Sequence, residues 1–246
     1  MYFDEYGSKE NPSVLMLHGA FFTDSFCRQY KLSDKYRLIV PHIKGFGRAA
    51  NETFDADVAV RELEDLTERF APVYLVGFSL GAQLAFRLVS EKPEYVRKAI
   101  IVSPWLVNKE TITEEMMNGN LKMLSQLKNR LFSGVIGFSM GLSKEKRNEF
   151  SGSMRLVSEE TVRKCVDNKI SFETVPGFRK IKVPVLALAG SREAPDIIES
   201  VKRMSEINDY CRCELFENAK HNIPTAYAKR FNQKLTDFFT DDGYSF

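Results

Sequence analysis

The sequence predicts an α/β fold in which a mostly parallel sheet carries helices on both faces. Three observations support this class. Apolar runs of strand length alternate with segments of helical spacing through most of the 246 residues, as is typical of parallel sheets. A glycine-rich turn at 77–81 joins one apolar run directly to a helical segment. Residues 105–178 interrupt the alternation with helical spacing alone, so we expect a separate helical layer there.

The expected elements follow one another along the chain. A short strand near 2–6 comes first, and the chain has room for only this one strand before the strand near 13–17. Further strands are expected near 13–17, 36–41, 73–78, 98–103, 183–189 and 212–216. Helices are expected near 24–33, 55–70, 81–91, 195–206 and 225–239. Acids at Asp55 and Asp57 fit a helix start, and Pro224 fits the first turn of the last helix.

The turn between the strand at 73–78 and the helix at 81–91 reads Gly77-Phe78-Ser79-Leu80-Gly81. So sharp a turn forces the central serine into a strained backbone conformation, and glycine on either side avoids a clash of Cβ with backbone. The serine hydroxyl would then lie over a helix N-terminus, which favours developing negative charge. A G-x-S-x-G pattern between a strand and a helix therefore predicts a nucleophilic serine, Ser79.

A serine hydroxyl needs a base, which is usually a histidine. The chain has three histidines, His18, His42 and His221. Where an elbow serine works with a histidine, the chain order is serine, acid, histidine. Only His221 follows Ser79, in a polar loop between the strand at 212–216 and the last helix. We therefore predict that His221 is the base.

The acid should follow a strand between Ser79 and His221, and the best strand in that interval is 183–189. Two carboxylates follow it. Glu193 comes first after the turn and is preferred. Asp196 is the alternative, although its position is also explained by capping or first-turn charge at the helix near 195–206.

An oxyanion formed at the serine needs two backbone N–H donors. One should come from Leu80, the residue after the nucleophile, and the other from the loop after an earlier strand. The strand at 13–17 leads into His18-Gly19-Ala20-Phe21, so the second donor is assigned to Phe21 or Ala20. His18 is expected to support this loop by hydrogen bonding.

These pieces resemble the α/β-hydrolase superfamily over nearly the whole chain. The matching segments stand in the family's order: Leu17-His18-Gly19, 36–41 with Gly45-Phe46-Gly47-Arg48, Gly77 to Gly81, Val183 to Glu193, and Lys220-His221-Asn222 with Pro224. The resemblance implies an α/β-hydrolase fold with a core at 1–104 and 179–246 and an inserted helical cap at 105–178. The family usually has aspartate where Glu193 stands, and often has aspartate where this chain has His42.

The expected function is that of a serine hydrolase that cleaves an ester or related acyl bond of a small, mainly apolar substrate. Ser79, His221 and Glu193 would form the triad, and neither a metal nor an organic cofactor is implied. Two alternatives stay open. The fold hosts many chemistries, so a lyase or C–C hydrolase could use the same triad. A small-molecule receptor or regulatory protein could also keep the pocket.

Amino-acid composition limits the classes of binding partner that we expect. Lys and Arg number 35 against 33 Asp and Glu, and this balance argues against nucleic acid as the main partner. No apolar run approaches the length of a membrane span, and no signal peptide is visible, so we expect no membrane partner and a cytoplasmic location. The four cysteines are expected to be free thiols.

Overall fold

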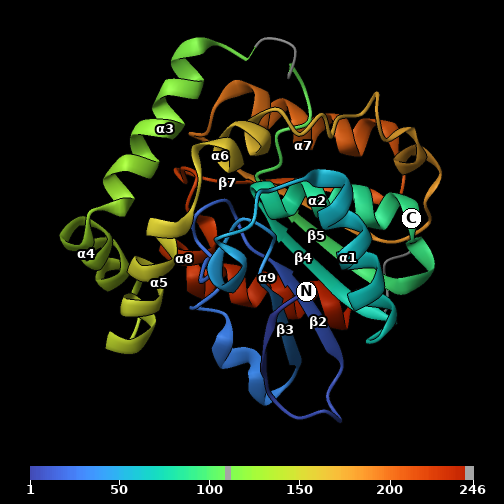
Figure 1. Ribbon diagram of the computed structural model, residues 1–246. Helices are drawn as coiled ribbons and strands as arrows, with labels where there is room; N and C mark the ends of the chain where they lie inside the picture. Colours follow the sequence, from blue (N-terminus) through green and yellow to red (C-terminus); the bar gives the residue numbers. More distant parts are fainter. Residues whose placement is uncertain (109–111, 242–246) are drawn as a thin grey trace.

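In the part of the chain that the structure describes, seven strands form one sheet in the order β1-β3-β2-β4-β5-β6-β7 (Figure 1). The computed structural model describes residues 1–108 and 112–241. The strands are β1 (Phe3–Tyr6), β2 (Ser13–Leu17), β3 (Arg37–Pro41), β4 (Val73–Phe78), β5 (Val96–Val102), β6 (Val185–Gly190) and β7 (Cys211–Phe216). Only the edge pair of β1 and β3 is antiparallel among these neighbours. The predicted mostly parallel sheet is therefore confirmed.

Helices cover both faces of the sheet because successive strand residues point to opposite sides. On β2, Leu15 and Leu17 belong to the apolar cluster that contains the helices α1 (Ala56–Glu68), α2 (Leu80–Glu91) and α7 (Pro195–Ile207). Val14 and Met16 face the opposite way, toward α9 (Ala228–Thr240). Figure 1 shows α1 and α2 in front of the strands and α9 behind them. The sheet is thus buried on both faces.

Two expected helices differ from the structure. Residues 24–29 form turns, followed by a short 3₁₀ helix, Tyr30–Asp34. Here the N–H groups of Ser25, Cys27 and Gln29 each bond to the carbonyl three residues earlier, so helical spacing without the α-helical bond pattern misled the prediction. The last expected helix is broken at Tyr227 into a single turn, α8 (Ile223–Ala226), and the longer α9.

The segment between β5 and β6 is helical in its described part, as predicted. It contains α3 (Glu114–Lys128), α4 (Arg130–Met140), α5 (Lys144–Leu156), α6 (Glu159–Val166) and a 3₁₀ helix, Pro176–Lys180. A side-chain oxygen caps the first turn of each α-helix, from Thr113, Asn129, Ser143 and Ser158 in turn, which explains where these helices begin. Residues 109–111, inside the predicted cap at 105–178, lie outside the described residues.

Two further expectations can be compared with the described residues. The structure records all four cysteines as free thiols, as the sequence predicts. No helix formed by residues 1–108 or 112–241 is both long enough and apolar enough to cross a bilayer.

The start of α2 lies against the end of β2 at a distance that only glycine permits. A Cβ on Gly81 would overlap the carbonyl of Leu17 and lie 2.6 Å from the carbonyl oxygen of His18. On the other side of the turn, a Cβ on Gly77 would overlap the carbonyl oxygen of Gly81 and lie 2.8 Å from the Cα of Ala82. Both predicted glycine positions are therefore required by close backbone packing.

We expect Gly81→Ala to destabilise the protein by about 3 kcal/mol or more, because neither backbone can move away without disturbing the sheet. Denaturant unfolding measures the change. The matched control is Gly134→Ala in the middle of α4, where no atom lies within 4 Å of the added Cβ. That control should be neutral or stabilising by up to about 1 kcal/mol through helix propensity. Equal stability of the two variants would contradict this account.

Candidate active site

Ser79 stands between β4 and α2 in a backbone conformation that is rare for a residue with a side chain. Its φ is 54° and its ψ is −116°. The Ser79 N–H donates to the Val102 carbonyl at the end of β5, 2.9 Å away, and the Ser79 carbonyl accepts from the N–H groups of Ala82 and Gln83 in the first turn of α2. These bonds hold the strained turn and leave the hydroxyl free to point outward from the sheet edge.

The His221 imidazole lies beside this hydroxyl. Its Nε2 is 2.9 Å from the Ser79 Oγ, and the Phe78 ring lies against it with the ring centres 5.0 Å apart. The loop that carries His221 is held from two sides. Tyr227 donates its hydroxyl to the Asn218 carbonyl, and the Arg192 N–H donates to the Ala219 carbonyl. The imidazole is therefore positioned by the end of β6 and the start of the C-terminal helices.

Glu193 occupies the other side of the imidazole. Its Oε2 lies 2.6 Å from the His221 Nδ1, while its Oε1 accepts from the Ser103 hydroxyl and the Gly190 N–H, each at 2.7 Å. The side chain is fully buried. Burial alone would raise the pKa of this carboxyl, but the hydrogen bonds from His221, Gly190 and Ser103 lower it overall. Glu193 is therefore held as a carboxylate that faces His221.

Asp196, the alternative acid, has a different neighbour. Its Oδ1 accepts from the side-chain amide of Asn108 at 3.0 Å. Asp196 lies in the first turn of α7, where the N-cap residue is Ala194 and no side chain caps the helix, so the capping explanation is wrong and the first-turn explanation is right. The structure thus brings Glu193, and not Asp196, to His221.

The candidate oxyanion donors lie at the same edge of the sheet. Phe21 has a φ of 67°, and it lines one cavity together with Ala20, Leu80 and Ser79. Within the described part of the chain, neither the Phe21 nor the Leu80 N–H donates a hydrogen bond. The loop is braced by Ser25, whose hydroxyl accepts from the Gly19 N–H and donates to the Phe22 carbonyl.

The other two histidines have structural contacts. His18 is fully buried; its Nδ1 lies 2.8 Å from the Gly19 carbonyl and its Nε2 accepts from the Ile43 N–H at 3.1 Å. These partners require a neutral ring with the proton on Nδ1. Burial lowers the pKa of His18 to about 3. His42 accepts from the Arg48 N–H at 3.0 Å and lies 3.4 Å from Asp4.

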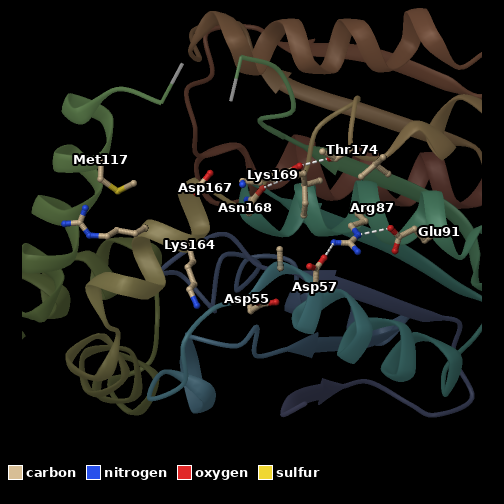
Figure 2. A pocket seen from close by; sticks show the side chains of 14 residues that line it. Asp55, Asp57, Arg87, Glu91, Met117, Lys164, Asp167, Asn168, Lys169 and Thr174 are labelled. Carbon is tan, nitrogen blue, oxygen red and sulfur yellow. Dashed lines mark hydrogen bonds and ion pairs between the residues drawn. The ribbon is translucent and has the colours of Figure 1, made fainter. Parts of the chain in front are cut away.

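Ser79 opens into a cavity of ≈ 220 Å³, called the serine cavity here. Its walls combine the sheet edge with side chains of α3, α6 and α7. These include Phe46, Gln83, Trp105, Met116, Asn120, Val162, Cys165, Val166 and Ile197. A second cavity of ≈ 580 Å³ lies on the other side of α6 and does not include Ser79. Figure 2 shows this charged cavity, in which Arg87 bonds to Asp57 and Glu91.

Several residues of the site carry little or no signal in the sequence. Ser103 directly follows β5, has a φ of 55° and bonds to Glu193, but its sequence signal is only that it follows a strand. Gln83 and Trp105 line the serine cavity, and nothing in their sequence context distinguishes them from core residues. Ser79, Ser103 and Phe21 have a positive φ, as do Asn108, Lys169 and Asn218, so backbone strain points to the site only together with the hydrogen bonds.

The chain belongs to the α/β hydrolase fold family, whose model matches residues 12–224. It is 23% identical over 251 residues to the carboxylesterase YbfK of Bacillus subtilis (strain 168), covering 94% of this chain and 81% of that protein. Among solved structures, it is similar to the bromoperoxidase from Bacillus anthracis, with a TM-score of 0.75, 20% identity and coverage of 98% of this chain and 95% of that one. The esterase EaEST from Exiguobacterium antarcticum is also similar, with a TM-score of 0.72, 19% identity and coverage of 96% and 94%.

Because His18 is neutral in the folded protein, we expect it to make stability depend on pH. Its pKa falls from the ordinary 6.5 to about 3 on folding, so its contribution is complete above pH 6.5 and is lost as pH falls toward 3. The loss amounts to roughly 4 kcal/mol at pH 3. Urea unfolding of the wild type and His18→Gln between pH 7 and 3 should show a smaller pH dependence in the variant. An equal change in the free energy of unfolding with pH in the two proteins would contradict the prediction.

Proposed function

We propose that this protein is a serine hydrolase that cleaves a carboxylic ester or a related acyl bond. One observation carries the proposal. Ser79, His221 and Glu193 form a continuous hydrogen-bonded chain, with 2.9 Å between Ser79 Oγ and His221 Nε2 and 2.6 Å between His221 Nδ1 and Glu193 Oε2. Nucleophile, base and orienting carboxylate need this order and these distances.

In the proposed mechanism, the Ser79 Oγ attacks the substrate carbonyl while His221 Nε2 accepts the hydroxyl proton. The oxyanion is stabilised by the backbone N–H groups of Leu80 and Phe21. His221 then gives the proton to the leaving alcohol, which departs and leaves an acyl-enzyme. A water molecule then attacks this ester while His221 accepts its proton, and His221 returns the proton to Ser79 Oγ as the carboxylic acid leaves. Throughout, Glu193 keeps the His221 proton on Nδ1 and stabilises the imidazolium.

The serine cavity supports a small, mainly apolar substrate. Its volume of ≈ 220 Å³ is below the range of about 300 to 1,000 Å³ that is typical of ligand pockets. Side chains of α3 and α6 form part of its wall, among them Met116, Val162 and Val166. We therefore assign the helical segment the role of a cap over Ser79, and the proposed chemistry needs no metal or organic cofactor.

The similarity to a carboxylesterase over most of both chains supports the ester-hydrolase proposal. The similar solved structures include proteins named as esterase and as bromoperoxidase, and identities near 20% identify only the shared fold. The choice of hydrolase therefore rests on the hydrogen-bonded chain at Ser79.

A fluorophosphonate probe tests the nucleophile. The wild type should be labelled on Ser79, as mapped by mass spectrometry, and should turn over short acyl esters of p-nitrophenol. Ser79→Ala should lose the labelling and reduce kcat by several orders of magnitude, because the acyl-enzyme cannot form. Ser125→Ala, on the exposed side of α3, is the matched control and should keep both. Labelling without turnover of any ester would instead support a receptor or regulatory protein.

The acid is tested by a second matched pair, Glu193→Gln and Asp196→Asn. Glu193→Gln should reduce kcat roughly 100-fold or more, because a neutral amide cannot stabilise the imidazolium. Asp196→Asn should have a much milder effect, since its carboxylate bonds to Asn108 and asparagine can still accept that bond. Steady-state kinetics on one ester measure both. The reverse order of damage would make Asp196 the acid.

A further inference from the structure

The serine cavity and the charged cavity lie back to back, with α6 and the residues after it between them. Along this stretch, Val162, Cys165 and Val166 line the serine cavity. Their sequence neighbours, Arg163, Lys164, Asp167 and Asn168, line the charged cavity. One short segment therefore presents an apolar face to one cavity and a polar face to the other. Figure 2 shows Lys164, Asp167 and Asn168 at the border of the charged cavity.

The partition between the cavities includes a hydrogen bond that joins α2 to this segment. Gln83 lines the serine cavity and Asn168 lines the charged cavity. The Asn168 Nδ2 donates to the Gln83 Oε1 at 2.8 Å. Both side chains are buried, with 6% and 9% of their surface exposed. The hydrogen bond thus joins a residue that lines one cavity to a residue that lines the other.

The backbone fixes which way these amides face. The Asn168 Oδ1 accepts from the Ile170 N–H at 2.9 Å, and its Nδ2 also donates to the Cys165 carbonyl at 2.8 Å. Because a backbone N–H can only donate and a carbonyl can only accept, the Asn168 amide cannot be reversed. Gln83 therefore presents its oxygen to Asn168, and the contact is held in one arrangement.

We propose that the Gln83–Asn168 hydrogen bond is the end wall of the serine cavity and limits the substrate to a short acyl or alkyl chain. This inference rests on the proposed ester hydrolysis at Ser79. Gln83 is one helical turn beyond the nucleophile, since its N–H donates to the Ser79 carbonyl at 3.2 Å. The wall consequently lies about 6 Å along the helix from Ser79. A chain longer than a few carbons meets two buried amides that it cannot replace as hydrogen-bond partners.

Removal of the wall should join the serine cavity of ≈ 220 Å³ to the charged cavity of ≈ 580 Å³. The experiment measures kcat/KM of the wild type, Gln83→Ala and Asn168→Ala on p-nitrophenyl esters from acetate to decanoate, and on alkyl acetates of the same lengths. In one of the two series, kcat/KM of the wild type should fall roughly tenfold or more beyond a short-chain optimum. In both variants the optimum should shift to longer chains, and the double variant should shift no further than either single one.

Controls separate this inference from the proposed function. Gln233→Ala changes a glutamine of α9 that bonds to Asp237 and lies outside both cavities, so it should keep the wild-type profile. Thermal unfolding verifies that each variant is folded, and Asn168→Ala provides the test if Gln83→Ala does not fold. Fluorophosphonates with ethyl and decyl tails report the same selectivity through the rate of Ser79 labelling. If Ser79 is labelled but the chain-length profile is the same in the variants as in the wild type, the inference of an end wall is wrong and the hydrolase proposal stands. The same holds if the wild type shows no limit on chain length. Absence of both labelling and turnover would overturn the hydrolase proposal and the wall with it.

Discussion

The contact of the first turn of α2 with the last carbonyls of β2 is the constraint on which the site depends. At Gly81 the two backbones approach so closely that no side chain fits between them. The same approach brings the loop after β2 against the elbow, since a Cβ on Gly19 would lie 3.3 Å from the Cβ of Ser79. The nucleophile and the loop of oxyanion donors are therefore packed directly against each other, and the Ser25 hydroxyl braces the loop from within.

The buried carboxylate of Glu193 plays the corresponding part on the other half of the sheet. It joins the end of β5 through Ser103, the end of β6 through Gly190, and the late loop through His221. A buried charge is costly unless hydrogen bonds compensate for it, and here both carboxylate oxygens accept hydrogen bonds. Three segments that are far apart in the sequence are thereby kept in register around one imidazole.

The sequence predicts the strands and most helices because apolar periodicity and glycine positions directly reflect sheet burial and tight turns. It also predicts Ser79, because the flanking glycines indicate a tight turn. It predicts His221 because only one of the three histidines follows Ser79 in the chain. Glu193 is preferred only by its place after a turn, and the only sequence signal of its partner Ser103 is that it follows a strand. The helix expected at 24–33 fails because local spacing does not reveal that the Ser25 hydroxyl bonds to the loop backbone. Long-range contacts such as Gln83 with Asn168 are invisible until the chain is folded.

The helical segment leaves the sheet after β5 and returns to it at β6, and these two strands are direct neighbours paired from Ala99 with Val185 to Val102 with Leu188. Because the two strands are parallel, the segment has to cross from the carboxyl end of β5 back to the amino end of β6, where Val185 lies opposite Ala99 and not opposite Val102. Loop-closure entropy grows only with the logarithm of length, so doubling such an insertion costs about 0.6 kcal/mol. The greater constraint on exchanging these helices is packing, because Leu124, Phe150 and Val162 are buried in the same apolar cluster as the sheet. A different helical segment could therefore change selectivity over unchanged chemistry only if it preserved these apolar contacts.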